Sequence, residues 1–234
     1  MTTIRLPDSI TACLFDLDGV LTTTAKIHFA AWKQMFDAYL QERDGAGYAP
    51  FTQHDYDAYV DGRPRYDGVR GFLESRGIQL AEPQVRELGD RKNVLVNQII
   101  ESQGVEPYPG SVRFLDAVRE AGLRTAVVSS SANCKAVVEA AGIADRLEVR
   151  VDGVTIEREH LKGKPAPDSF LRAAEELGVD KSAAAVFEDA LAGVEAGRAG
   201  GFGCVVGVNR VGQAEALKEH GADVVVDDLG ELLG

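Results

Sequence analysis

Two carboxylates one residue apart, Asp16 and Asp18, follow a short apolar run near the start of the chain. The run covers residues 10–15 and is typical of a buried β-strand, whereas the Asp and Gly residues after it do not prolong strands. We therefore expect both acids at the carboxyl edge of a sheet, which is where open α/β sheets bind ligands. One carboxylate at such an edge can serve as nucleophile and metal ligand while the other moves protons.

A series of polar side chains follows a second apolar run: Ser129, Ser130 and Ser131, then Asn133 at the expected start of a helix. Hydroxyls and backbone N–H groups at a helix start can hold phosphate oxygens. We expect Ser129 and Ser130 to bind phosphate, and Ser131 and Asn133 to face the substrate. The alternative is that these residues only cap the helix, which serine does well.

A lysine and a pair of acids complete the candidate residues. Lys164 precedes Pro165, and Pro167 follows two residues later, so that the proline rings stiffen the loop around the lysine. A cation fixed in this way can neutralise a phosphate or an aspartyl phosphate, although a lysine in a loop is usually only solvated. Glu188 and Asp189 follow a further apolar run, and such paired acids suit Mg²⁺, a hard cation that prefers oxygen ligands.

The segments that must position these residues alternate between apolar and amphipathic patterns. Nearly continuous apolar runs predict strands over residues 10–15, 123–128, 183–187, 204–208 and 223–226. Helical patterns lie between the later runs, over residues 112–120, 169–177 and 191–198. This alternation predicts an α/β fold with a doubly wound, Rossmann-like parallel sheet that is covered on both faces.

Residues 24–103 have a different character. Their helical patterns, around residues 25–41, 66–75 and 83–102, are interrupted by glycine and proline, and none of their segments is typical of a strand. We predict an α-helical cap domain inserted into a core that comprises residues 1–23 and 104–234. The segment 104–110, which contains two prolines, is predicted to be the linker that returns to the core.

The composition limits the partners and the compartment. A net charge of −12 over 234 residues argues against binding to nucleic acid or to a membrane surface. The chain has no apolar stretch long enough to span a bilayer, and its N-terminus lacks the apolar core of a signal peptide. Cys13, Cys134 and Cys204 are odd in number and far apart, which favours reduced thiols over disulfides or a zinc site. We expect a cytoplasmic protein and, because cap movement favours it, a monomer.

The order of these motifs, Asp-x-Asp-Gly-Val, Ser, Lys-Pro and Glu-Asp, resembles the haloacid dehalogenase superfamily of phosphotransferases over the whole chain. The resemblance implies that Asp16 forms a phosphoaspartate and that Asp18 acts as general acid and base. It also implies a Mg²⁺ ion between Asp16, the Asp18 carbonyl oxygen and Asp189, with Glu188 in support.

By the same resemblance, Ser129 binds the transferring phosphoryl group and Lys164 neutralises the nucleophile and the phosphate. Phosphoryl transfer requires mainly in-line positioning and neutralisation of charge, and these residue types can supply both.

The start of the cap resembles the β-phosphoglucomutase branch of this superfamily. Thr24 and His28 lie one helical turn apart and share a face, so both can approach Asp18 if that face looks back at the site. In that branch such a threonine and histidine, together with a cap lysine, control when the acid/base group swings into place. Residues 91–93 resemble the segment that carries this lysine, which makes Lys92 the candidate.

A second cap segment, residues 62–65, resembles the loop whose arginine binds the second, non-reacting phosphate, which makes Arg65 the candidate. The chain also departs from the pattern. Thr23 stands where relatives often have Asp, and Ala132 and Ala190 stand where the mutases commonly carry Lys and Ser. These departures weaken the assignment of glucose specificity.

The resemblance implies a mutase that converts β-D-glucose 1-phosphate into glucose 6-phosphate, with β-D-glucose 1,6-bisphosphate as intermediate and activator. The first alternative is a phosphatase that hydrolyses a small phosphorylated sugar or metabolite. A third reading, a phosphorylatable signalling domain, is opposed by the length of the chain and by the large helical insert.

Overall fold

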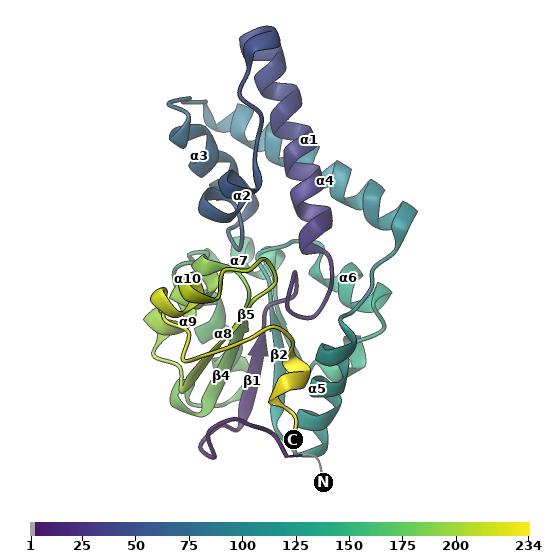
Figure 1. Ribbon diagram of the computed structural model, residues 1–234, viewed down its shortest axis with the longest axis vertical. Coiled ribbons are helices and arrows are strands. Elements are labelled where there is room, and N and C mark those ends of the chain that lie inside the picture. Colours follow the sequence, from purple (N-terminus) through teal and green to yellow (C-terminus); the bar gives the residue numbers. More distant parts are fainter. Residues whose placement is uncertain (1–2) are drawn as a thin grey trace.

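Six parallel strands form one sheet in the order β3-β2-β1-β4-β5-β6 in the computed structural model, which describes residues 3–234 (Figure 1). The strands are β1 (Ala12–Phe15), β2 (Arg124–Val128), β3 (Val149–Val151), β4 (Ala184–Glu188), β5 (Cys204–Val208) and β6 (Val224–Val226). Both faces of β1 are buried: Cys13 and Phe15 contribute to one apolar cluster, and Ala12 and Leu14 contribute to another. Helices therefore cover both faces of the sheet, as its nearly continuous apolar strands predict.

The helices that cover the sheet all follow the insert in the chain. They are α5 (Pro109–Glu120), α6 (Cys134–Ala140), α7 (Gly153–Glu159), α8 (Asp168–Leu177), α9 (Leu191–Gly200) and α10 (Ala214–Glu219). Phe114 of α5 and Val137 of α6 pack in the cluster that contains Phe15. Phe170 of α8 and Ala196 of α9 pack in the cluster on the opposite face.

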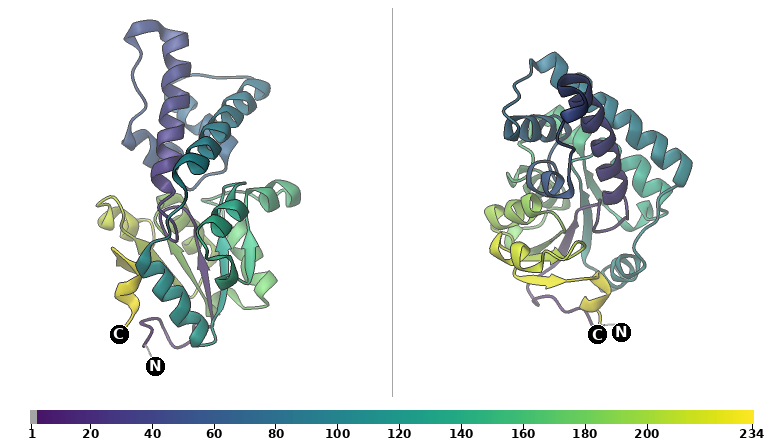
Figure 2. Two further views of the ribbon diagram at one scale, coloured as in Figure 1. Left: turned by 90° about the vertical axis from the view of Figure 1, so that its right-hand side faces the viewer. Right: turned by 45° about the horizontal axis from the view of Figure 1, so that its top comes forward.

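Four helices lie between β1 and α5 in the chain: α1 (Ala25–Asp44), α2 (Gln53–Tyr59), α3 (Arg65–Ser75) and α4 (Glu82–Gln103). They have an apolar core of their own, in which Phe36, Phe51 and Phe72 lie with ring centroids 4.3 to 5.1 Å apart. Figures 1 and 2 show this group beyond one end of the sheet, with both chain termini at the far end of the molecule. We refer to α1–α4 as the cap.

The predicted fold class is confirmed, and the five predicted strands are present with shifts of one or two residues at their ends. One strand and three helices were missed because they are short: β3 has three residues with an exposed arginine in the middle, α2 and α7 have seven residues each, and α10 has six. The predicted linker was too long. Helix α5 begins at Pro109, since a proline fits the first position of a helix, and the connection is residues 104–108. The division into domains at residues 23 and 103 stays a prediction.

Among residues 3–234, no helix is at once long enough and apolar enough to cross a membrane.

Candidate active site

Three loops meet at the carboxyl edge of the sheet because β1 lies between β2 and β4. Phe15, the last residue of β1, pairs with Val127 of β2 and with Phe187 of β4. The residues that follow these strands are therefore brought side by side. The backbone N–H of Asp16 continues the ladder by donating to the Phe187 carbonyl at 2.9 Å, which directs the next residues out of the sheet.

Asp16 is held by a lysine from a distant loop. Lys164 Nζ lies 2.5 Å from Asp16 Oδ1 and 2.6 Å from Glu188 Oε1, and it donates to the Val128 carbonyl at 3.1 Å. These three bonds use all three protons of the ammonium. Burial opposes the charge on Lys164, but the carboxylates of Asp16 and Glu188 outweigh burial and raise the pKa of the lysine. The lysine therefore keeps its charge. Burial and the carboxylates of Glu188 and Asp18 raise the pKa of Asp16 well above its ordinary value, and Lys164 opposes this rise.

Three buried carboxylates form a candidate metal centre. Asp16, Glu188 and Asp189 each offer an oxygen, and these oxygens lie within 4.8 Å of one another. Lys164 contributes only one positive charge to this cluster, and buried negative charge is unfavourable without compensation. Burial and the neighbouring carboxylates raise the pKa of Asp189 well above its ordinary value. An all-oxygen donor set fits a hard divalent cation such as Mg²⁺ better than zinc or copper.

Gly19 explains why the acids are followed by glycine. Its φ of 92° is a conformation that favours glycine, and a Cβ there would overlap the Asp189 carboxylate. The turn after Asp18 can therefore lie directly against Asp189.

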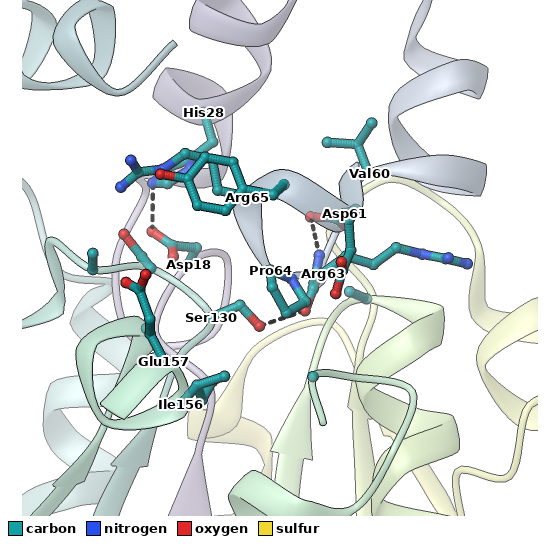
Figure 3. Close-up of a pocket in the computed structure, with 18 of the residues that line it drawn as sticks. Asp18, His28, Val60, Asp61, Arg63, Pro64, Arg65, Ser130, Ile156 and Glu157 are labelled. Carbon is teal, nitrogen blue, oxygen red and sulfur yellow. Dashed lines mark hydrogen bonds and ion pairs between the residues drawn. The ribbon is translucent and has the colours of Figure 1, made fainter. Parts of the chain in front are cut away.

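Asp18 contacts both the core and the cap. Thr24 Oγ1, just before α1, donates to Asp18 Oδ1, and Ser129 Oγ lies 3.5 Å from the other carboxylate oxygen. His28 Nε2, from the first turn of α1, lies 3.4 Å from Asp18 Oδ1 without the alignment of a hydrogen bond. Figure 3 shows the imidazole directly above the carboxylate.

His28 is held in turn by Lys92 of α4. Lys92 Nζ lies 2.8 Å from His28 Nδ1 and 4.8 Å from the centre of the Trp32 ring. Burial and the adjacent Lys92 charge lower the pKa of His28 to about 4, and burial lowers the pKa of Lys92 to about 7. The imidazole is therefore neutral at pH 7. With Nδ1 accepting from Lys92, its proton is on Nε2 and faces Asp18.

The other predicted polar residues join the core to the cap. Ser130 Oγ donates to the Gly62 carbonyl at 2.7 Å, and Asn133 Nδ2 donates to Asn93 Oδ1 at 2.9 Å. The Ser131 hydroxyl accepts from the Asn133 N–H at 3.2 Å in the turn before α6, and no side chain caps the first turn of that helix. Two of these three side chains, those of Ser130 and Asn133, therefore join the cap to the core.

A cavity of about 660 Å³ lies between the cap and the sheet edge, large enough for a small ligand. The predicted residues that line it from the core are Asp16, Asp18, Ser130, Ser131 and Asp189, and those from the cap are His28, Arg65 and Lys92. Arg65 also donates to Asp90 at 3.1 Å. The structure thus brings predicted residues of both parts to one cavity, whereas Thr24, Ser129, Asn133, Lys164 and Glu188 do not line it.

Asp61 is a cavity residue that the sequence analysis missed. It stands before Gly62 in a segment interpreted only as a helix break. Burial raises the pKa of its carboxyl group to about 7. The hydrogen bond with the Tyr56 hydroxyl opposes this rise, and the nearby Glu188 carboxylate adds to it. The position of Asp61 directly before the Gly62–Arg65 loop was the only signal in the sequence, and its approach to the acid cluster depends on how the cap meets the core.

Comparison with known proteins gives a consistent result. The family model for haloacid dehalogenase-like hydrolases matches residues 10–201. A β-phosphoglucomutase of Mycobacterium tuberculosis (strain CDC 1551 / Oshkosh) is 55% identical, over 98% of this chain and 94% of that protein. The β-phosphoglucomutase of Bacillus subtilis (strain 168) is 33% identical, over 94% of this chain and 91% of that protein. A solved structure of β-phosphoglucomutase from Clostridium difficile has a TM-score of 0.79 and 27% identity, over 95% of this chain and 93% of that one.

Proposed function

Because the chain belongs to the haloacid dehalogenase-like hydrolases, and to the β-phosphoglucomutase branch among them, we propose that it interconverts β-D-glucose 1-phosphate and glucose 6-phosphate. The family membership makes the chain an enzyme and removes the alternative of a signalling domain. The substrate, the cofactor and the role of each residue are our proposal.

Asp16 is the proposed nucleophile. Its carboxylate oxygen attacks phosphorus, the bond between phosphorus and the sugar oxygen breaks, and a phosphoaspartate forms. Lys164, whose ammonium lies 2.5 Å from Asp16 Oδ1, favours the ionised form of the attacking group against the effect of burial and would balance the charge of the phosphoryl oxygens. Ser129, which follows β2 and is 1% exposed, is the proposed donor to one of those oxygens.

A bound Mg²⁺ would supply further neutralisation of charge on the phosphoryl group. Asp16, Asp189 and the Asp18 carbonyl would hold it, with Glu188 in support. The oxygen cluster of Asp16, Glu188 and Asp189 described above is the basis for this assignment.

Control of Asp18 by the cap is the observation that carries the mutase proposal. Thr24 bonds the Asp18 carboxylate, His28 Nε2 lies 3.4 Å away, and Lys92 supports the histidine from α4. Asp18 would give a proton to the leaving sugar oxygen and take one from the attacking hydroxyl. Because residues of the cap and of the chain leading to it contact this carboxylate, we expect movement of the cap to control where Asp18 lies. Asp18 would then reach the sugar oxygen only when the cap closes over the substrate and excludes water.

In the complete reaction, phosphorylated Asp16 transfers its phosphoryl group to O6 of β-D-glucose 1-phosphate. The resulting β-D-glucose 1,6-bisphosphate returns its C1 phosphoryl group to Asp16 and leaves as glucose 6-phosphate. Arg65, which lines the cavity from the cap, is the proposed contact of the non-reacting phosphate.

The second candidate is a phosphatase for small phosphorylated sugars. Ala132 and Ala190, which line the cavity, have no polar side chain to offer a second phosphate, and this favours a substrate with only one. The two candidates would differ only in what accepts the phosphoryl group from the phosphoaspartate: in the phosphatase, the acceptor would be water.

Purified enzyme with MgCl₂, β-D-glucose 1-phosphate and a trace of β-D-glucose 1,6-bisphosphate distinguishes the two candidates. The mutase proposal predicts glucose 6-phosphate as the main product, measured with glucose-6-phosphate dehydrogenase, and little inorganic phosphate. Release of inorganic phosphate without glucose 6-phosphate would refute the mutase and support the phosphatase.

A further inference from the structure

Arg210, two residues after β5, bonds the backbone of the catalytic turn. Its Nε donates to the Gly19 carbonyl at 2.7 Å, and its Nη2 lies 3.5 Å from the Val20 carbonyl. Its Nη1 donates to the Asp227 carbonyl at 2.8 Å, so the guanidinium joins the turn to the C-terminal segment of the chain. The side chain is 14% exposed, which makes these bonds well shielded from water.

The same loop also holds the second metal-binding segment. Gln213 Nε2 donates to the Asp189 carbonyl at 2.9 Å, and the Gln213 N–H donates to Asn209 Oδ1 at 2.7 Å. One short loop therefore bonds the residue after Asp18 and the backbone of Asp189. Because Gly19 lies directly against the Asp189 carboxylate, a shift of either segment changes the distance between them.

Arg210 also contacts the connection from the cap. Its guanidinium carbon lies 3.6 Å from the centre of the Tyr108 ring, and the Tyr108 N–H donates to the Leu21 carbonyl at 2.9 Å. The outgoing and returning chains are joined again by the Thr23 N–H, which donates to the Glu106 carbonyl at 3.0 Å. The arginine thus lies where the catalytic turn meets both chains that lead to the cap.

We propose that Arg210 is a positioning residue that fixes the Asp18–Gly19 turn relative to Asp189, with Gln213 as the second contact from the same loop. The inference rests on the proposed function, in which the Asp18 carboxylate moves protons and its carbonyl holds the metal. Arginine suits this task because its planar fork reaches several carbonyl oxygens at once, whereas lysine presents a single charged point.

The first test is hydrogen exchange of residues 18–22 by mass spectrometry in EDTA, where neither metal nor substrate is present. Arg210→Gln should speed exchange in this peptide about tenfold, since the turn loses its anchoring bonds. Arg210→Lys should give an intermediate effect.

The second test is binding of Mn²⁺, followed by electron paramagnetic resonance, together with kcat and KM. Loss of an outer contact of a metal site weakens metal binding or activity by about 10-fold to 100-fold. We expect Arg210→Gln to weaken Mn²⁺ binding about tenfold and to lower kcat about 10-fold to 100-fold, with KM for the sugar phosphate changed less.

Arg124→Gln is the matched control. Arg124 donates to the Leu177 carbonyl at 2.9 Å and to Glu148 at 2.6 Å, and it pairs with Ala12 at the amino end of the sheet. This variant loses a comparable set of bonds far from the site, and it should leave exchange in residues 18–22, Mn²⁺ binding and kcat unchanged.

The proposal would be overturned if folded Arg210→Gln exchanged hydrogen in residues 18–22 and bound Mn²⁺ as the wild type does. It would also be overturned if Arg124→Gln changed exchange, Mn²⁺ binding and kcat as much as Arg210→Gln does. If Arg210→Gln does not fold, Gln213→Leu decides by the same readouts. If the wild type turns over no sugar phosphate while the variants still differ in exchange and Mn²⁺ binding, the proposed function fails and the positioning role stands.

Discussion

Replacing Lys92 by methionine should make the protein more stable at neutral and acidic pH while it impairs catalysis. Lys92 is 5% exposed, and burial lowers its pKa from 10.5 to about 7. Between about pH 7 and pH 10.5, Lys92 is protonated in the unfolded chain and neutral in the folded chain. The stability of the wild type therefore rises with pH across this window, and the full penalty is present below about pH 7.

The magnitude follows from the difference in pKa. At about 1.4 kcal/mol per pH unit, the buried ammonium destabilises the fold by about 5 kcal/mol below pH 7. Methionine has a similar length and carries no charge, but it forfeits the contacts with His28 and the Trp32 ring, which contribute about 2 kcal/mol together. We expect Lys92→Met to be more stable than the wild type by about 3 kcal/mol at pH 6.5 and to lose this advantage by pH 10.

Urea unfolding in EDTA at pH 6.5, 7.5, 8.5 and 10 measures the effect. With a denaturant slope of about 3 kcal/mol per molar, the midpoint should rise by about 1 M at pH 6.5. Lys26→Met is the matched control, since Lys26 is an exposed lysine of the same cap, and it should show no comparable gain. A stability difference between Lys92→Met and the wild type that stays constant from pH 6.5 to 10 would refute the reasoning. So would a gain of equal size in Lys26→Met.

Three further predictions concern the catalytic residues. Asp16→Asn should lower kcat at least 10⁴-fold and abolish labelling of the protein by a ³²P-phosphoryl donor, and retained labelling would exclude Asp16 as the nucleophile. Thr24→Val removes the hydroxyl that donates to Asp18 and should lower kcat about tenfold, whereas a change confined to KM would contradict a role in orienting Asp18. Gly193→Ala should destabilise the fold by about 2 kcal/mol in urea and reduce activity, because the new methyl group overlaps the buried Glu188 carboxylate; a neutral result would show that Glu188 can move freely.

The strands near the active site were predictable because their signal is local. β1, β4 and β5 are buried on both faces and form uninterrupted apolar runs in the sequence, and the acids at the ends of β1 and β4 mark where those two strands stop. The edge strand β3 gave no such signal, because three residues with Arg150 in the middle are too short to show a pattern.

The cap contacts were predictable only in part. Thr24 and His28 are close to Asp18 in the chain, so helical spacing alone indicated their shared face. Lys92 lies 64 residues from His28, and their contact depends on how α4 packs on α1. The approach of Asp61 to the buried acid cluster depends in the same way on how the cap packs against the core.

The sequence by itself determined the residue types of the site and the strand that each one follows, because strand ends and glycine turns are recognisable from neighbouring residues in the chain. Tertiary structure alone decided the charge state and the anchoring of those residues. Burial lowers the pKa of Lys92, two carboxylates raise the pKa of Lys164, and Arg210 bonds Gly19 across 191 positions of the chain. These effects depend on desolvation and on contacts between distant segments, and neither exists until the chain has folded.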